Sequence, residues 1–290
     1  MKQRILCLLA ALAFLGGVAK AETIFGLTAG GAIFSFNSAS PNTISGLALV
    51  TGIGSDTLVD IDFYPVNGAL FGFAASGNLY RIDPFTGAAV LDVTPSTSMG
   101  TVQHADFNPM ADRARILSAG NANFRITPST QTAGPSAMPG QVTPDGNFAF
   151  ASGSGTGTPN LFGAAYSNNF DGTSLTSLYT IDANFLYLNS GGPQFSTLNR
   201  VGALGLTLGG FNGFDISQSS GLAFLTDNDN LYTVDLSTGA ATLVGTIGGA
   251  LGADTISIAS QAVPEPSTYA LVGIGLVGLL VVLRRRQATA

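Results

Sequence analysis

The sequence is poor in the side chains on which most enzymatic and metal chemistry depends. Among 290 residues it has one cysteine, one histidine and no tryptophan, and only 10% of its residues are charged. Cys7 lies in the N-terminal apolar segment described below, so the mature chain has no disulfide, thiolate metal site or cysteine nucleophile. His104 alone cannot build a histidine-rich metal site. We therefore predict no metal and no cofactor.

Lysine is almost absent as well. Removing the six basic residues of the two terminal signals (Lys2, Arg4, Lys20, Arg284, Arg285 and Arg286) from the 11 in the chain leaves five. All five are arginines: Arg81, Arg113, Arg115, Arg125 and Arg200. Because the chain has 17 Asp and Glu residues, its surface is acidic and repels nucleic acids and anionic membrane surfaces. Nucleic-acid binding is excluded on this ground.

The N-terminus has the three parts of a secretory signal peptide. Lys2 and Arg4 are positive, Ile5–Val18 is apolar, and Ala19-Lys20-Ala21 has the A-x-A pattern of a cleavage site. We predict a signal peptide over residues 1–21, with Glu22 as the mature N-terminus.

The C-terminal residues 263–290 form a second signal. The sequence Pro264-Glu265-Pro266 precedes the apolar run Tyr269–Leu283, and Arg284-Arg285-Arg286 follows it. Fifteen helical residues span about 22 Å, against roughly 30 Å of hydrocarbon. We predict a short transmembrane helix over residues 269–283, and the three arginines that follow it should stay in the cytoplasm. An ordinary membrane anchor is the alternative.

This order of Pro-Glu-Pro, apolar segment and arginines resembles the PEP-CTERM sorting signal of Gram-negative bacteria. The resemblance implies export by the secretion machinery and processing by the membrane protease exosortase, often in organisms that make extracellular polysaccharide. The expected path is an intermediate anchored in the inner membrane, followed by the cell surface or the extracellular matrix.

The body of the chain, residues 22–262, contains an internal repeat. Residues 78–94 read NLYRIDPFTGAAVLDVT and residues 230–246 read NLYTVDLSTGAATLVGT, with weaker copies elsewhere. Strands of alternating apolar and polar residues are separated by Gly, Asn, Asp or Pro. Four antiparallel strands in every 40–50 residues are typical of a β-propeller.

We predict an all-β fold, a propeller of five four-stranded blades. The first strands should begin near Asp60, His104, Phe162, Gly213 and Asp254. Thr255–Ala259 lacks the rest of its blade, and Ile24–Val50 lacks a first strand, so the two segments should pair and close the ring. A β-sandwich or β-solenoid is the alternative.

The repeat phrases also resemble a known family. The D-F-x-P turn at Asp106–Pro109 and the L-Y-x-[IV]-D-x-x-T-G-A-A strand pair are similar to an uncharacterised family of exported bacterial domains, over roughly residues 23–260. The resemblance implies a propeller-like fold and supplies no catalytic residues.

Aspartates of the first strands are the main candidates for chemistry. Asp60 and Asp62 share one strand face, and Asp106 and Asp215 hold matching positions in other units. Five-bladed propellers include glycosidases, which use two carboxylates, so a glycoside hydrolase or lyase that uses channel aspartates is one interpretation. Because the aspartates recur with the repeat, we favour a structural role for them. His104 at a strand start has the same two interpretations.

Two further polar groups belong to turns. The Thr-Gly pairs Thr86-Gly87 and Thr238-Gly239 follow Asp83 and Asp235, which can accept hydrogen bonds from turn N–H groups. Asp227-Asn228-Asp229-Asn230 offers oxygen ligands suited to Ca²⁺, although it lacks the glycine and bidentate glutamate of an EF-hand. A polar hairpin tip is the other interpretation.

Three of the five arginines, Arg113, Arg115 and Arg125, fall in the third unit. Arg113 and Arg115 share a strand face and Arg125 lies on the next strand, so together they suit a carboxylate or sulfate of a polysaccharide. Internal pairing with Asp106 and Asp112 is the alternative. We expect a non-enzymatic protein of the cell surface or matrix that binds exopolysaccharide.

Overall fold

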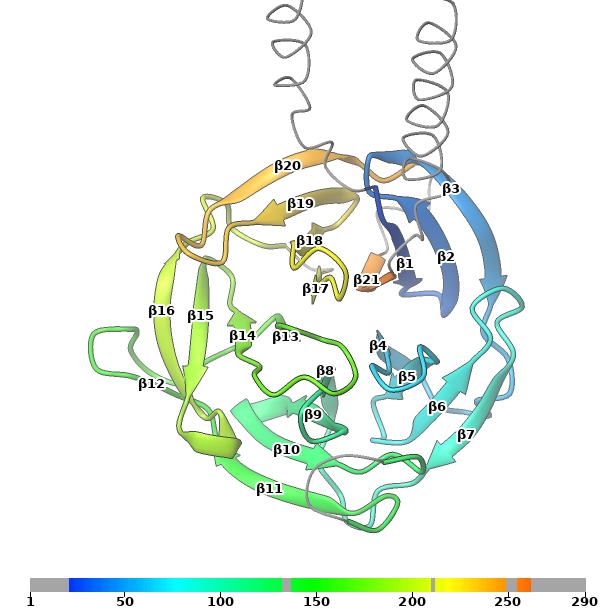
Figure 1. Cartoon of the computed structure of the whole chain (residues 1–290), viewed down its shortest axis with the longest axis horizontal. Helices are drawn as coiled ribbons and strands as arrows, with labels where there is room; N and C mark the ends of the chain where they lie inside the picture. The colour runs from blue at the N-terminus through cyan, green and yellow to red at the C-terminus, as the bar shows by residue number, and fades with distance from the viewer. Residues whose placement is uncertain (1–20, 132–136, 210–211, 249–254, 262–290) are drawn as a thin grey trace, which may run out of the picture.

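Short strands with tight turns arrange themselves as five small sheets around a central axis (Figure 1). The structure is a computed structural model that describes residues 21–131, 137–209, 212–248 and 255–261. The predicted signal peptide and C-terminal helix lie outside these residues, apart from Ala21. No helix within the described ranges is long and apolar enough to cross a membrane.

Each sheet is one blade, and four of the five follow the chain order from the channel outward. Blade 2 contains β4 (Leu58–Phe63), β5 (Leu70–Ala74), β6 (Leu79–Ile82) and β7 (Ala89–Val93). Blade 3 contains β8 (Val102–Asn108), β9 (Arg113–Ser118), β10 (Ala122–Ile126) and β11 (Val142–Asn147). Blade 4 contains β13 (Gly163–Tyr166), β14 (Leu178–Ile181), β15 (Phe185–Ser190) and β16 (Thr197–Ala203). Blade 5 contains β17 (Asn212–Ile216), β18 (Ala223–Asp227), β19 (Asn230–Val234) and β20 (Ala241–Thr246).

Blade 1 joins the two ends of the domain. It contains β21 (Thr255–Gln261), β1 (Thr23–Thr28), β2 (Ala32–Asn37) and β3 (Ser40–Leu49), with β21 innermost. β21 pairs antiparallel with β1, and Phe25 lies opposite Ala259. The predicted closure is confirmed, as are the five blades. The inner strands begin within two residues of the predicted starts.

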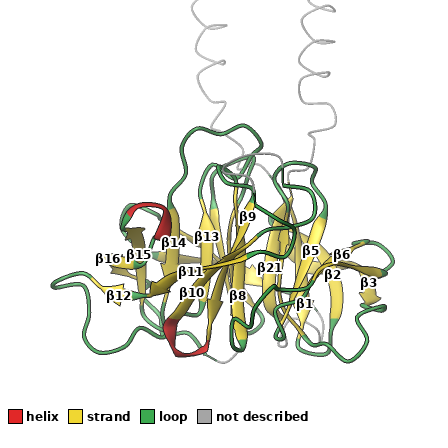
Figure 2. Ribbon diagram, turned by 90° about the horizontal axis from the view of Figure 1, so that it is seen from below, coloured by secondary structure: helices red, strands yellow, loops and turns green. Residues whose placement is uncertain are grey.

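Two additions were not predicted. Blade 4 has a fifth strand, β12 (Ala149–Phe150), which runs parallel to β16 at the outer edge. Two 3₁₀ turns, Ala119–Asn121 and Gly192–Gln194, are the only helical pieces in the described part of the chain. Figure 2 shows the second of them near β15 and β16, and its Pro193 and Gln194 carbonyls accept hydrogen bonds from Arg115 and Asn123 of blade 3.

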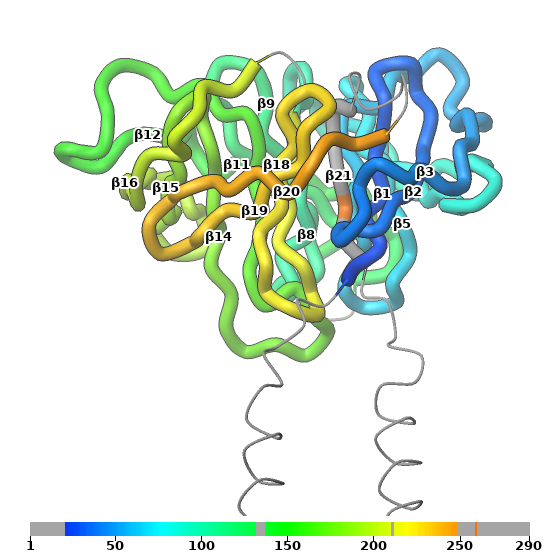
Figure 3. Tube along the Cα trace, turned by 90° about the horizontal axis from the view of Figure 1, so that it is seen from above, coloured from blue at the N-terminus to red at the C-terminus, as the bar shows by residue number. Residues whose placement is uncertain are grey.

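The apolar core is divided into clusters that lie between neighbouring blades. For example, Phe25 and Ile33 of blade 1 pack with Ile61 and Leu70 of blade 2. The inner strands of adjacent blades also contact one another in a complete circle: β21 with β4, β4 with β8, β8 with β13, β13 with β17, and β17 with β21. In Figure 3 the strands of the first and last blades lie side by side, as circular closure requires. Side chains on the inner strands are therefore brought to one axis.

The predicted Thr-Gly turns have the expected structure. Asp83 Oδ1 accepts hydrogen bonds from the N–H groups of Phe85 (2.9 Å) and Thr86 (3.1 Å). Gly87 has a φ of +72°, a conformation that favours glycine. The turn also joins two blades, because Thr51 N–H donates to the Gly87 carbonyl at 3.0 Å.

We expect the substitution Gly87→Ala to lower the free energy of unfolding by about 2–3 kcal/mol. A Cβ at this position would lie 2.3 Å from the Leu49 carbonyl oxygen, in addition to the strain of a positive φ. Gly68→Ala is the matched control, because Gly68 has a φ of +67° but no heavy atom within 4 Å of its added Cβ. Urea denaturation should show a smaller loss for Gly68→Ala. Equal losses would mean that the contact between blades 1 and 2 is unimportant.

Candidate functional site

Four aspartates lie on the inner strands and are buried. Asp60 and Asp62 are on β4, Asp106 is on β8 and Asp215 is on β17. Asp62, Asp106 and Asp215 hold matching places on their inner strands. Each lies directly opposite a residue of the second strand of its blade: Phe71, Arg115 and Phe224, respectively. Their convergence on the channel axis was predicted from the repeat.

Three of these carboxylates join one blade to the next. Asp60 Oδ2 accepts the N–H of Ala105 and Asp62 Oδ2 accepts the N–H of Phe107, both at 2.8 Å and both on β8. Asp106 Oδ1 accepts the N–H of Tyr166 on β13 at 3.0 Å. Inner strands have no strand partner on the channel side, so these side chains satisfy backbone donors that would otherwise be buried without an acceptor.

The aspartates also crowd one another. One carboxylate oxygen from each of Asp62, Asp106 and Asp215 lies within 4.8 Å of the other two. Burial raises the pKa of Asp62 well above its usual value, and the charge of Asp215 raises it further. Burial likewise raises the pKa of Asp106, followed by the charges of Asp62 and Asp215. Each ionised carboxylate in this low-dielectric site therefore makes ionisation of its neighbours less favourable, and the groups titrate as a coupled set.

Oxygen donors of this kind suit hard cations. Ca²⁺ takes six to eight oxygens and Mg²⁺ needs six in an octahedron, whereas the three aspartates offer three carboxylates, two of which already accept a backbone N–H. The trio therefore fits such an ion only with ligands from solvent. Because each side chain is less than 5% exposed, a sugar ring has no direct access to the carboxylates.

His104, near the start of β8, lies beside Asp60 of β4. Its Nδ1 is 3.8 Å from Asp60 Oδ2. Burial lowers the pKa of His104 to about 4, so the imidazole is neutral at pH 7.

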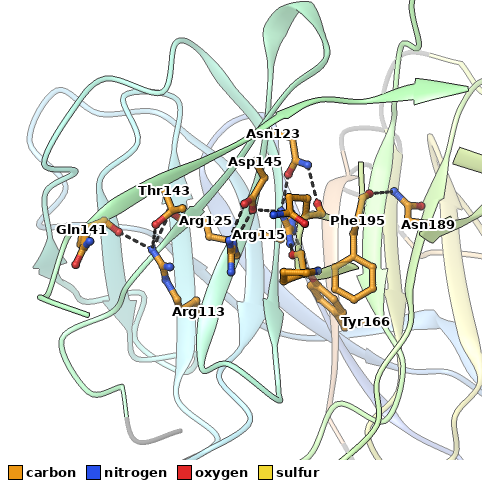
Figure 4. Close-up of polar contacts among 12 residues, drawn as sticks. Arg113, Arg115, Asn123, Arg125, Gln141, Thr143, Asp145, Tyr166, Asn189 and Phe195 are labelled. Atoms are coloured by element: carbon orange, nitrogen blue, oxygen red, sulfur yellow. Dashed lines mark hydrogen bonds and ion pairs between the residues drawn. The ribbon is translucent and has the colours of Figure 1, made fainter. Parts of the chain in front are cut away.

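The three arginines of the third unit lie on the face of blade 3 that meets blade 4. Arg113 and Arg115 are on β9, and Arg125 on β10 is directly opposite Arg115. Figure 4 shows the three guanidinium groups in a row, with Asp145 of β11 between Arg125 and Arg115. We call these three arginines and Asp145 the arginine row.

Arg115 is the best-held member of the arginine row. It is fully buried, and its Nη1 donates to Asp145 Oδ2 at 2.5 Å and to Asn123 Oδ1 at 2.7 Å. Its Nε donates to the Tyr166 hydroxyl at 3.1 Å, and its Nη2 to the Pro193 carbonyl at 2.9 Å. These partners come from two blades, so Arg115 fastens blade 3 to blade 4.

Arg125 and Arg113 are held less completely. Arg125 donates from Nε and Nη2 to both oxygens of Asp145, each at 2.6 Å, and its side chain is 17% exposed. Arg113 Nη2 donates to Thr143 Oγ1 at 2.9 Å and to the Gln141 carbonyl at 3.0 Å. Arg113 Nε is buried without a hydrogen-bond partner among the described residues. Burial lowers the pKa of Arg113, and the charge of Arg125 lowers it further, while Asp145 opposes both.

The structure thus brings the predicted arginines together, and the carboxylate that pairs with Arg115 and Arg125 is Asp145. The sequence analysis named Asp106 and Asp112 for this role and missed Asp145. The missed residue stands in Thr143-Pro144-Asp145-Gly146, which reads as a turn and not as a strand. Tyr166 and Asn123 were also missed, because nothing in their local sequence distinguishes them from other strand residues.

The acidic tip at Asp227 is a hairpin turn between β18 and β19. Asn228 has a φ of +53°, which asparagine tolerates in tight turns. Asp227 Oδ1 accepts the N–H of Gly209 at 2.7 Å and the side-chain amide of Asn212 at 3.2 Å. This carboxylate holds a neighbouring loop, which is the structural interpretation.

Comparison with known families agrees with this architecture. The family described as a domain of unknown function (DUF4394) matches residues 32–259. The chain belongs to the DUF4394 family. The PEP-CTERM protein-sorting motif matches residues 262–286, which include the predicted Pro264-Glu265-Pro266 and the three arginines. This DUF4394 protein is therefore exported, directed to the cell surface and processed by exosortase.

Two solved structures match most of the chain at low sequence identity. A chain of the nidogen/laminin complex is 14% identical with a TM-score of 0.44, and the match covers 85% of this chain and 100% of that one. The extracellular domain of BT4673 from B. thetaiotaomicron is 11% identical with a TM-score of 0.38, and the match covers 81% of this chain and 29% of that one. No curated protein matches the sequence.

Proposed function

We propose that this DUF4394 protein is a non-enzymatic protein of the cell surface or extracellular matrix that binds an acidic polysaccharide. The observation that carries the proposal is the arginine row, in which three guanidinium groups lie around a single carboxylate and only Arg115 and Arg125 pair with it. In a chain with a formal net charge of −6, this concentration of positive charge favours an anionic ligand.

Arg125 is the member of the arginine row most open to solvent, because its side chain is 17% exposed whereas Arg113 and Arg115 are buried. Arg113 Nε has no hydrogen-bond partner among the described residues, and the part-exposed Arg125 is held through Nε and Nη2. Guanidinium groups bind carboxylates and sulfates through paired N–H donors. We therefore place the acidic group of the polysaccharide at Arg125, with Arg113 adding positive charge behind it.

The channel aspartates support a role without catalysis. Asp60, Asp62 and Asp106 each accept a backbone N–H of the next blade, and they are nearly inaccessible to solvent. A glycosidase needs both of its carboxylates beside the scissile bond. Hydrolysis or elimination at these aspartates would require the blades to separate, so we assign the aspartates to the fold.

Binding is tested with the exported protein, immobilised polyuronate or sulfated glycan, and a neutral glucan as the comparison. We expect the acidic glycans to bind and the neutral one not to bind. Arg125→Gln should weaken binding at least about 10-fold, as expected for loss of a charge-assisted contact. Arg81→Gln is the matched control, because Arg81 is half exposed in blade 2 and pairs only with Asp92 among the described residues.

A reducing-sugar assay on the same glycans tests the alternative of a glycoside hydrolase or lyase. Turnover that disappears in Asp62→Asn or Asp106→Asn would overturn the proposal. Equal binding by Arg125→Gln and Arg81→Gln would remove the arginine row from it.

We also propose that the protein passes through an inner-membrane intermediate of a Gram-negative cell before release. The apolar run Tyr269–Leu283 would hold Pro264-Glu265-Pro266 just outside the bilayer, within reach of exosortase, and proline would keep that segment extended for a protease cleft. Replacing the Pro-Glu-Pro sequence with three alanines should trap the chain in the inner membrane. Mass spectrometry of surface material should find no peptide that extends through Leu283; intact peptides would indicate a plain anchor.

A further inference from the structure

The first buried residue of the folded domain is a glutamate. Glu22 is 1% exposed, whereas Ala21 immediately before it is exposed. Its backbone is fixed at two points, because its N–H donates to Ser38 Oγ at 2.9 Å and its carbonyl accepts the N–H of Ser38 at 2.8 Å. The chain thus enters the fold at Glu22, directly before β1.

The carboxylate of Glu22 has few partners. Oε1 accepts a hydrogen bond from Ser219 Oγ at 3.3 Å, and Oε2 is buried with no hydrogen-bond partner in the described part of the chain. The ion pairs formed within that part do not include Glu22. Ser219 belongs to the turn between β17 and β18, so the carboxylate lies between blades 1 and 5. A buried carboxylate without a cation is strongly unfavourable.

Cleavage of the signal peptide would supply a positive charge beside the Glu22 carboxylate. The A-x-A pattern that ends at Ala21 predicts cleavage of the Ala21–Glu22 peptide bond by a signal peptidase. Water adds across the bond, and Ala21 leaves with a carboxylate while Glu22 gains an α-amino group. That amine is protonated at neutral pH. It arises on the nitrogen that already contacts Ser38 and is four bonds from the side-chain carboxyl carbon.

We propose that cleavage at Ala21–Glu22 completes a buried ion pair between the new α-ammonium group and the Glu22 carboxylate, and thereby strengthens the joint between blades 1 and 5. The ammonium has three donors, so it keeps the hydrogen bond to Ser38 and turns the others toward the carboxylate. The precursor has a neutral amide at this position and leaves the carboxylate without a counter-charge. Processing is thus coupled to the stability of the closed propeller.

The proposal first requires that Glu22 be the mature N-terminus. Mass spectrometry of the protein exported by its native host should find Glu22 as the first residue with a free amine. A different N-terminus, or a mass lower by one water from cyclisation of the glutamate, would overturn the proposal.

The ion pair itself is tested with matched N-termini on otherwise identical chains. A cleavable leader yields one form that begins at Glu22 and one that begins at Ala21, and the first is also prepared with its α-amine acetylated. We expect the Glu22 form to melt at least about 3 °C above the other two. In Glu22→Gln, which keeps the shape but has no charge, the three forms should melt together. Equal midpoints in the native sequence, or a difference that persists in Glu22→Gln, would overturn the ion pair.

Discussion

Replacing Asp145 with alanine is expected to lower the free energy of unfolding by about 3–5 kcal/mol, the range found when one member of a buried ion pair is removed. Asp145 holds Arg115 through Oδ2 and Arg125 through both oxygens. Its removal leaves three guanidinium groups on one face of blade 3 with no carboxylate between them. The fully buried Arg115 then repels Arg125, its direct neighbour across β9 and β10.

The comparison variants separate charge from shape. Asp145→Asn keeps one acceptor oxygen and the volume of the side chain, so its loss should be smaller than that of Asp145→Ala. Arg81→Ala removes the half-exposed partner of the buried Asp92 carboxylate, which keeps its hydrogen bonds from Ser129, and should cost no more than about 1 kcal/mol. Urea denaturation measures all three. A loss in Asp145→Ala no larger than that in Arg81→Ala would show that the arginine row does not depend on Asp145.

The same variant bears on the ligand. If the arginine row attracts anions, added sulfate should stabilise Asp145→Ala more than the native protein, because an anion that binds only the folded state raises its stability. Sodium chloride at equal ionic strength is the control for general screening. An equal effect of both salts on the two proteins would argue against a specific anion site.

The blade architecture could be predicted from the sequence because the repeat carries it. The two copies at residues 78–94 and 230–246 define the strand pattern, and the unpaired segments at the two ends require closure. The structure confirms the pairing of β21 with β1. The short β12 could not be predicted, because Ala149–Phe150 has two residues and pairs with β16, which follows three other strands later in the chain. Pairing over such a distance has no local sequence pattern.

The candidate site was predicted only in part, for a similar reason. Alternation along β9 places Arg113 and Arg115 on one face, but it does not say which carboxylate meets them. Asp106 and Asp112 are near in sequence, yet Asp145 lies on the outermost strand of the same blade. The burial of Arg115 depends on Pro193 and Tyr166 in blade 4, and the packing of one blade on another leaves no trace in the periodicity of either.

The second large effect concerns pH. We expect the free energy of unfolding to be higher at about pH 5.5 than at about pH 8.5, the reverse of ordinary acid denaturation. Burial and mutual repulsion raise the pKa of Asp62 and of Asp106 above the value of 3.8 that applies in the unfolded chain. The folded state therefore binds more protons than the unfolded state between these values. The stabilisation is complete below pH 3.8 and is lost as the pH rises through the raised pKa of each group.

His104 acts in the opposite direction over a narrower range. Its pKa is about 4 in the folded protein and 6.5 otherwise, so the unfolded state binds the extra proton and stability falls as the pH drops from 6.5 toward 4. The histidine thus offsets part of the aspartate effect at acidic pH and none of it above pH 6.5. The variant His104→Gln should steepen the gain in stability on acidification and leave the behaviour at alkaline pH unchanged.

The decisive comparison is Asp62→Asn against Asp62→Ala. Asparagine retains an oxygen that can accept the N–H of Phe107, and it removes the charge that acts on Asp106. Its free energy of unfolding should equal or exceed that of the native protein at alkaline pH, and its pH dependence should be flatter. Alanine leaves the Phe107 N–H buried without an acceptor. The free energy of unfolding of Asp62→Ala should therefore be about 1–3 kcal/mol lower than that of Asp62→Asn at every pH. An unchanged pH dependence in Asp62→Asn would contradict this prediction, because it would mean that neither the raised pKa of Asp62 nor its charge on Asp106 sets the response to pH.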